Sequence, residues 1–450
     1  MKDFTEGNAA KQMIAFAVPM LVGNIFQQVY GMVDAMIVGN YVSVNALASV
    51  GTSIFILDFL LAVLMGLTTG ASIAISQFFG AKRMDELKRA VSTSMIFLVI
   101  LSLLISAAGI ILAPNLLRMM NTPEEIFTDA VWYLRILLGS TPFLLIYNFY
   151  AAFLRALGDS RMPLYFLILS TVVNAGLDLV FVVFFKWGVQ GAAYATLFSQ
   201  ILAAVLCFLY TYKKVPLLRI DQFIFDRELF RQILRYSVPA AVQMSLSSVA
   251  ALTIMRLVSS FGPVSTASYT ACTRIDAFAI MPIVSMSMAV SMFVAQNMGA
   301  RNEKRAKSGL RSALLFMSAV AIILSGLLFL LGPRLISLFI DTSDPNAGNI
   351  IREGTQYLMT VGLFYVLFSI YFGFLGFFRG AGDAIIVMIM NIASLGIRSV
   401  SAHILVEQFG MGIEAVAVSM PIGWVICAVF GLFYYKKRLW QGKIAFVSKA

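Results

Sequence analysis

Long apolar runs alternate with short polar segments along the whole chain, and this pattern predicts its structure. Twelve runs approach or exceed the ~20 residues that an α-helix needs to cross a bilayer. None alternates apolar and polar positions as the strands of a membrane β-barrel do. We therefore predict an all-α integral membrane protein with spans at residues 13–38, 51–75, 92–113, 131–153, 163–185, 190–211, 238–261, 272–295, 311–331, 355–377, 384–406 and 412–434.

The two halves of the chain resemble each other. Three motifs recur in the same order 219 to 224 residues later: Ala17–Pro19 as Ser237–Pro239, Gln77–Lys82 as Gln296–Arg301, and Phe153–Asp159 as Phe377–Asp383. Each half holds six spans, an even number, so both halves have the same orientation. This is the parallel repeat of transporters whose substrate cavity lies between the halves. Gly80-Ala81-Lys82 and Gly158-Asp159 predict tight turns in which glycine permits positive φ.

Composition and charge agree with a membrane protein and set its orientation. Of 450 residues, 60% are hydrophobic and 12% charged, with a mean hydropathy of +0.88, which excludes a soluble globular protein. The net charge of +11 would suit nucleic-acid binding, but 25 of the 33 Lys and Arg residues fall on one side of the predicted spans and five on the other. The positive-inside rule then places both termini in the cytoplasm, with the basic charge facing anionic lipid. We expect a multi-pass protein of the plasma or inner membrane.

The segment between spans six and seven is the longest connection. We predict an N-lobe at 1–212, a cytoplasmic linker at 213–236 and a C-lobe at 237–450. Within the linker, residues 225–234 have the pattern of an amphipathic surface helix with basic residues on its polar face.

The first span carries a carboxylate. Asn24, Gln27, Gly31 and Asp34 are spaced 3, 4 and 3, which predicts one polar stripe along a helix. A carboxylate inside a membrane span is costly unless it faces a cavity or a partner. Asp34 is therefore a candidate functional residue.

Partners for Asp34 occur in spans five and six. Asn174 and Asp178 are four apart and share a helix face, and Thr196 lies in the sixth span. At ~1.5 Å per residue, Asp34 lies about 8 Å from the outer end of its span and Asp178 and Thr196 about 12 Å, so these three lie at similar depths. This set of side chains suits a site that binds a hard cation or shares protons. The alternative is a structural polar network that locks the lobe.

The second half lacks the matching acids. Ile254 and Arg398 stand where Asp34 and Asn174 would be. We expect Arg274 and Asp276 to cap an end of span eight and Asp58 to open span two. Candidates to line a substrate cavity are Asn24, Gln27, Gln28, Tyr30, Met255, Arg256, Arg398 and His403.

Catalytic and cofactor motifs are missing from the sequence. No phosphate loop, H-E-x-x-H or G-x-S-x-G motif occurs, and the three cysteines have no metal-ligand or disulfide spacing. We therefore expect no enzyme, no metal and no cofactor.

The motifs above give the chain a family resemblance. It resembles the multidrug and toxic compound extrusion (MATE) transporters over essentially its whole length, and within them bacterial, MepA-like members. The signs are Pro19, Gln28 and Asp34 in span one, Gln77-x-x-Gly80-Ala81, and Leu154-Arg155-Ala156-Leu157-Gly158-Asp159-x-x-x-Pro163.

The resemblance implies a function and roles for particular residues. It implies export of cationic, amphipathic compounds in exchange for H⁺ or Na⁺. In the DinF-like branch an ion site matches Asp34, Asn174, Asp178 and Thr196, and a bend in span one matches Pro19. The C-lobe acids of the NorM-like branch are absent, since spans seven and ten contain no Asp or Glu.

Other functions remain open at this point. A lipid-linked oligosaccharide flippase of the same superfamily is the first alternative, because Arg256 and Arg398 would suit a pyrophosphate. A membrane-embedded enzyme is a remoter one. The expected partners are small organic substrates and membrane lipid, with no nucleic acid, and the protein is expected to be a monomer.

Overall fold

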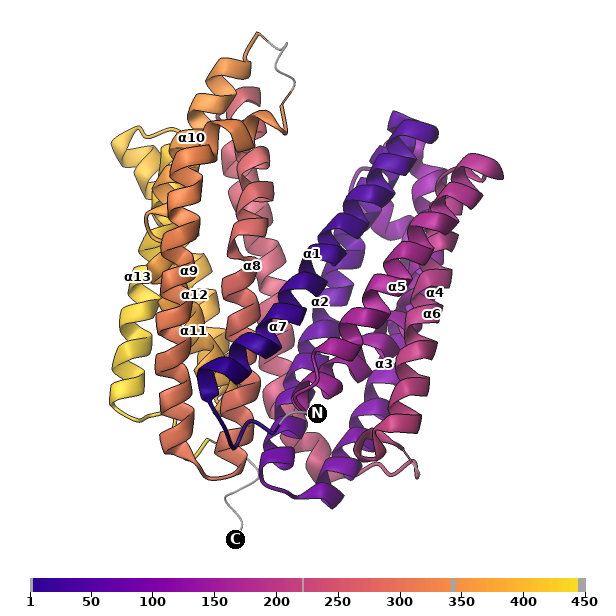
Figure 1. The fold of residues 1–450 in the computed structure, drawn as a ribbon. Coiled ribbons are helices and arrows are strands. Elements are labelled where there is room, and N and C mark those ends of the chain that lie inside the picture. Colours follow the sequence, from indigo (N-terminus) through magenta and orange to yellow (C-terminus); the bar gives the residue numbers. More distant parts are fainter. Residues whose placement is uncertain (1–2, 221, 341–344, 444–450) are drawn as a thin grey trace. The chain divides into compact units, whose positions relative to one another are not determined.

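The chain is built from helices. The computed structural model describes residues 3–220, 222–340 and 345–443, and within these ranges all regular structure is helical (Figure 1). The helices are α1 (Ala9–Tyr41), α2 (Val44–Gly80), α3 (Met84–Met119), α4 (Glu124–Ala156), α5 (Arg161–Asp178), the π-helix η1 (Leu179–Phe184), α6 (Gly188–Lys214), the short 3-10 helix η2 (Pro216–Leu218), α7 (Arg227–Ser259), α8 (Pro263–Gly299), α9 (Glu303–Ser337), α10 (Ala347–Gly362), α11 (Tyr365–Gly380), α12 (Ala384–Phe409) and α13 (Glu414–Lys436).

Among the described residues, eleven helical segments are long and apolar enough to cross a membrane, and the one remaining predicted span, span ten, is a bent pair. The predicted all-α membrane fold is thus confirmed, but span ten is not one helix. It consists of α10 and α11, which meet at an angle of 52°. A break within a membrane span leaves backbone carbonyls without their helical partners, and these carbonyls need another partner inside the protein. Ser325 Oγ donates to Gly362 O, at the end of α10 (2.6 Å).

The chain divides into two compact units. The first unit contains Pro19–Ser245, and the second contains Phe4–Val18 together with the chain from Leu246 onward. The units therefore differ from the lobes expected at 1–212 and 237–450: the start of α1 belongs to the second unit, and the start of α7 belongs to the first. The passage along α1 from one unit to the other falls at Pro19.

Specific contacts bind these exchanged helix starts. In the second unit, Phe4 N donates to Gln296 Oε1 (2.9 Å), and Arg305 Nε donates to Phe4 O (2.9 Å). In the first unit, Tyr236 OH donates to Gln77 Oε1 (3.4 Å). Gln77 and Gln296 are the same position of the repeated motif. Each therefore binds the segment that leads into the other half's first span.

The predicted surface helix at 225–234 is not separate. The structure shows one continuous helix, α7, from Arg227 to Ser259, which runs on through Pro239 at the start of the apolar span. Asp226 begins it: its Oδ1 accepts from Glu228 N and Leu229 N (both 3.0 Å), and its Oδ2 pairs with Arg89 Nη1 (3.1 Å). Residue 221 of the predicted linker lies outside the described residues.

The internal repeat extends to individual hydrogen bonds. Ser49 Oγ on α2 donates to Ile126 O on α4 (3.3 Å). Its counterpart Ser268 on α8 donates to Ile350 O on α10 (3.0 Å). Small hydroxyl residues let helices approach closely and give the backbone carbonyl a second partner. A serine-to-carbonyl hydrogen bond therefore joins α2 to α4 in the first unit and α8 to α10 in the second.

The turns of the repeated motifs follow the prediction in part. Gly158 (φ 82°) and Gly382 (φ 89°) have positive φ, as expected. In the other motif the prediction was wrong, because the positive φ falls on Lys82 (57°) and Arg301 (58°), while Gly80 ends the helix.

Gly70, like Gly66, allows α2 to pack closely against α7. A Cβ at Gly70 would overlap the backbone of Ser237, whereas a Cβ at Gly51, on the same helix, would meet nothing. We expect Gly70→Ala to destabilise the protein by about 1–3 kcal/mol, the usual cost of overpacking. Gly51→Ala should be neutral or stabilising by up to ~1 kcal/mol. Thermal unfolding of the purified variants in detergent measures both, and equal midpoints would contradict this packing.

Candidate functional site

Asp34 lies three-quarters of the way along α1, on the face that packs inside the first unit. Its side chain is buried, with 7% of its surface exposed. Tyr133 of α4 donates its hydroxyl hydrogen to the carboxylate. The other oxygen, Oδ1, is buried and has no hydrogen-bond partner. Asp34 is thus held by one neutral donor, with no basic side chain paired to it in the described part of the chain.

Asp178 and Asn174 bring α5 to the same site. Both are buried, and they lie one turn apart on the helix. With the Asn174 amide oriented to satisfy both neighbours, its nitrogen donates to Asp178 Oδ2 (3.1 Å), and its oxygen accepts from Thr196 N of α6 (3.2 Å). Asp178 Oδ1 is buried and has no partner.

Tyr30 closes the network from α1. Tyr30 lies one turn before Asp34 on α1, and its hydroxyl donates to Thr196 Oγ1 of α6 (3.0 Å). The carboxylates of Asp34 and Asp178 are near enough to interact electrostatically. The structure therefore brings together all four residues of the predicted ion site, and adds Tyr30 and Tyr133.

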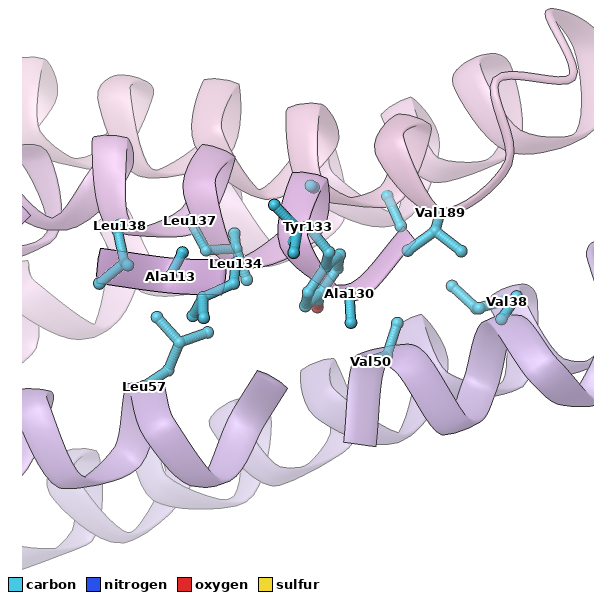
Figure 2. Packing of buried hydrophobic residues seen from close by; sticks show 14 of the residues in the cluster. Val38, Val50, Leu57, Ala113, Ala130, Tyr133, Leu134, Leu137, Leu138 and Val189 are labelled. Atoms are coloured by element: carbon cyan, nitrogen blue, oxygen red, sulfur yellow. The ribbon is translucent and has the colours of Figure 1, made fainter. Parts of the chain in front are cut away.

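An apolar cluster packs around Tyr133, at one side of the network. Tyr133 lies among aliphatic side chains of α1, α2, α4 and α6 (Figure 2). The labelled neighbours in that view include Val38, Val50, Ala130 and Val189. These side chains exclude water from one side of the site, which strengthens every electrostatic interaction within it.

A change of helix type follows directly after Asp178. The α-helix α5 ends there and continues as the π-helix η1. Segments of π-helix are rare and concentrate at functional sites. Gly191 of α6 lets that helix approach, since a Cβ there would lie 3.1 Å from the backbone of Phe181 in η1. This close approach positions Thr196, just over one turn further along α6.

The site has a definite chemical capacity. Two buried carboxylates repel each other, and each has one oxygen without a partner. A bound proton or a hard cation would relieve the repulsion and satisfy these oxygens. No group of three or more His, Cys, Asp or Glu side chains suited to a metal ion occurs among the described residues.

The remaining predicted residues lie elsewhere. Gln27 and Gln28 are exposed, and Asn24 is half-buried on α1. Met255, Arg256, Arg398 and His403 belong to the second unit. His403 Nδ1 lies 2.8 Å from Ser399 O on its own helix, a local contact.

Two acids were misplaced by the predicted span boundaries. Asp276 caps no helix end, because α8 begins at Pro263 and Asp276 lies well inside it, as does Arg274. Its carboxylate accepts a hydrogen bond from Tyr365 OH. Asp58 likewise lies in the middle of α2, exposed, rather than at its start. In both cases the helix extends further through polar residues than the apolar run alone indicates.

Tyr133 is the neighbour of Asp34 that the sequence analysis missed. The signal was present, because Tyr133 recurs as Tyr357, 224 residues later, at the offset that relates the other motifs. A tyrosine inside an apolar run is otherwise unremarkable.

Comparison with known proteins decides the family. The MatE family model matches residues 19–180 and 239–404, one match in each half. The chain belongs to the MatE family. Among curated MatE relatives, "Probable multidrug resistance protein YoeA" of Bacillus subtilis is 30% identical over 96% of this chain and 94% of its own, and "Probable multidrug resistance protein YpnP" of the same organism is 29% identical over 99% of both. "Multidrug export protein MepA" of Staphylococcus aureus is 23% identical over 95% of this chain and 93% of its own.

Solved MatE structures have the same fold. The "Crystal structure of MATE in the bent conformation" aligns with a TM-score of 0.90, at 24% identity, over 97% of this chain and 96% of the other. This is a multi-pass membrane protein of a multidrug efflux family. The coupling ion, the substrates and the roles of individual residues remain predictions.

A double-mutant cycle tests the bond between Tyr133 and Asp34. We expect Tyr133→Phe to destabilise the protein by about 1–3 kcal/mol, since it removes the donor to a buried carboxylate. In an Asp34→Asn background the loss should shrink, giving a coupling energy of about 0.5–3 kcal/mol. Tyr165→Phe, on an exposed tyrosine of α5, is the matched control and should change little. Additive losses in thermal or chemical unfolding would rule out the bond.

Proposed function

We propose that this protein is a secondary active antiporter. It exports cationic, amphipathic organic compounds from the cell in exchange for H⁺ or Na⁺. One observation carries the proposal: two buried carboxylates, Asp34 and Asp178, share a site and each leaves one oxygen unpaired. The names of the relatives as multidrug resistance and export proteins support the export of drug-like organic compounds.

The coupling follows from charge in a medium of low dielectric. With both carboxylates ionised, the site carries two negative charges that only neutral donors offset: Tyr133 at Asp34, and Asn174 at Asp178. Binding of a proton or Na⁺ removes most of the repulsion and favours a tighter arrangement of α1, α5 and α6. A cation-dependent change of this kind couples the ion to the substrate if the two arrangements differ in substrate affinity.

Tyr30 and Thr196 give this change a structural path. Their hydrogen bond joins α1 to α6 one turn from Asp34. A shift of α1 on ion binding therefore stretches or re-forms the hydrogen bond between Tyr30 and Thr196 of α6. The backbone N–H of Thr196 also donates to Asn174, so the shift reaches α5 as well. In this proposal Asn174 and Thr196 are positioning residues and the two acids bind the ion. Pro19, where α1 passes between units, is the proposed hinge, because proline removes one helical hydrogen bond.

Neutralising the acids tests the coupling. We expect Asp34→Asn and Asp178→Asn proteins to fold, because the amide keeps the size of the carboxylate and one acceptor oxygen, but to lose gradient-driven export. The measurement is ethidium efflux from proteoliposomes under H⁺ and Na⁺ gradients imposed separately, with efflux expected to fall to the no-gradient level. Glu125→Gln, on an exposed acid in the first turn of α4, is the control and should export as wild type. Wild-type efflux by both site variants would remove these acids from the mechanism.

The proposed orientation places both termini in the cytoplasm of the plasma or inner membrane. The three native cysteines are buried, so introduced cysteines report alone. We expect Glu124→Cys, at the start of α4, to react with an impermeant maleimide added to intact cells, and Asp85→Cys, at the start of α3, to react only after permeabilisation. The reverse pattern would invert the topology. The loop at 341–349 is also expected outside, although residues 341–344 lie outside the described residues.

A further inference from the structure

The second unit holds a buried basic group where the first unit holds an amide. Arg398 of α12 follows Asn174 by 224 residues, the offset that also relates Tyr133 to Tyr357. The tyrosine is thus retained in both units, while the residue at the position of Asn174 is the cationic Arg398. A charged side chain within a membrane span is costly and is a functional candidate by default.

The contacts of Arg398 leave its charge only partly matched. Its Nη2 donates to Tyr269 OH (3.1 Å), and its Nε is buried with no hydrogen-bond partner. Tyr269 packs edge-on against Tyr357, with 5.6 Å between ring centroids. One donor of the guanidinium is therefore satisfied, and another is held inside the protein without an acceptor.

The nearest acid does not complete the pairing. Asp276 interacts electrostatically with Arg398, yet its carboxylate accepts from Tyr365, and no ion pair joins it to Arg398 within the described ranges. Asp276 therefore offsets part of the positive charge of Arg398 without contacting it as an ion pair. It would also compete with any other anion near the guanidinium.

Comparison of the two units shows what Arg398 lacks. In the first unit, the Asn174 amide donates to Asp178, four residues further along the same helix. The residue four positions after Arg398 is Ala402, which has no acceptor. The second unit has therefore gained a stronger donor and lost the carboxylate that its counterpart donates to.

We propose that Arg398, framed by Tyr269 and Tyr357, binds the carboxylate of an organic ligand. The ligand's carboxylate takes the role that the Asp178 side chain has in the first unit. A guanidinium suits this, because its planar fork of donors matches a carboxylate in two parallel hydrogen bonds. The tyrosine rings favour a ligand whose carboxylate is attached to an apolar or aromatic body. Binding of this ligand does not depend on the antiport proposed above, whose cationic substrates would be taken up elsewhere or would carry a carboxylate as well.

Binding to the purified full-length protein in detergent tests the proposal without any gradient. The probe is benzoate, with benzamide as its neutral isostere and inorganic phosphate as the competing oxyanion, at constant ionic strength. We expect benzoate to raise the thermal unfolding midpoint in a saturable manner and benzamide to leave it unchanged. Stabilisation by phosphate at lower concentrations than benzoate would overturn the carboxylate assignment.

Variants locate the binding. Arg398→Gln should weaken benzoate binding by at least ~10-fold, a typical loss for a charged hydrogen bond. If that variant does not fold, Arg398→Lys serves instead, since it keeps the charge but loses the fork and should also bind more weakly. Asp276→Asn should tighten binding, because a competing negative charge is removed. Arg334→Gln, on an exposed arginine of α9, should bind as wild type.

Unchanged affinity in the folded Arg398 variant, or equal loss in Arg334→Gln, would refute the site. Failure of ethidium export would refute the proposed antiport and leave this binding result as it stands.

Discussion

Inside a bilayer, a polar group must find its partner within the protein, and this constraint explains most of the polar contacts in this chain. Hydroxyl side chains in the spans donate to backbone carbonyls, either on their own helix, as Ser53 does to Ser49 O (2.9 Å), or on a neighbour, as Ser291 does to Gly376 O (3.1 Å). Against this background the exceptions are informative. The charged side chains with an unpartnered buried atom, among the described residues, are Asp34, Asp178 and Arg398.

The two units share the same helix packing, but the polar side chains within that packing differ. The hydrogen bond from Ser49 has its counterpart in that from Ser268, and Tyr133 has its counterpart in Tyr357. The polar residues between these fixed points diverged, so that one unit holds two acids and the other an arginine. Helix packing depends on shape and on small residues, which tolerate such changes. The charged residues between the packed helices can therefore differ between the units without a change of fold.

The exchange of helix starts gives α1 and α7 a special position. Each begins in one unit and continues in the other, and the repeated glutamines Gln77 and Gln296 bind the segments at these starts. A helix shared in this way transmits a displacement of its inner part toward the start that is anchored in the other unit. Asp34 lies on such a helix, on the far side of Pro19 from the anchored start. This arrangement supports a role for α1 in coupling.

Much of the protein was determined by its sequence alone. Apolar length predicts the spans, since a helix must satisfy its own backbone in lipid, and the recurring motifs predict two halves of one design. The sequence predicted one site formed by Asp34, Asn174, Asp178 and Thr196. Polar groups in spans are rare, and helical spacing places Asn174 and Asp178 on a common face. Only the tertiary structure decided what the helical period cannot express: that Tyr133 donates to Asp34, that span ten breaks, and that helix starts are exchanged. It also showed Asp276 to be interior and Arg398 to lack an acceptor, because the partners of a buried charge come from distant segments and depend on packing between helices.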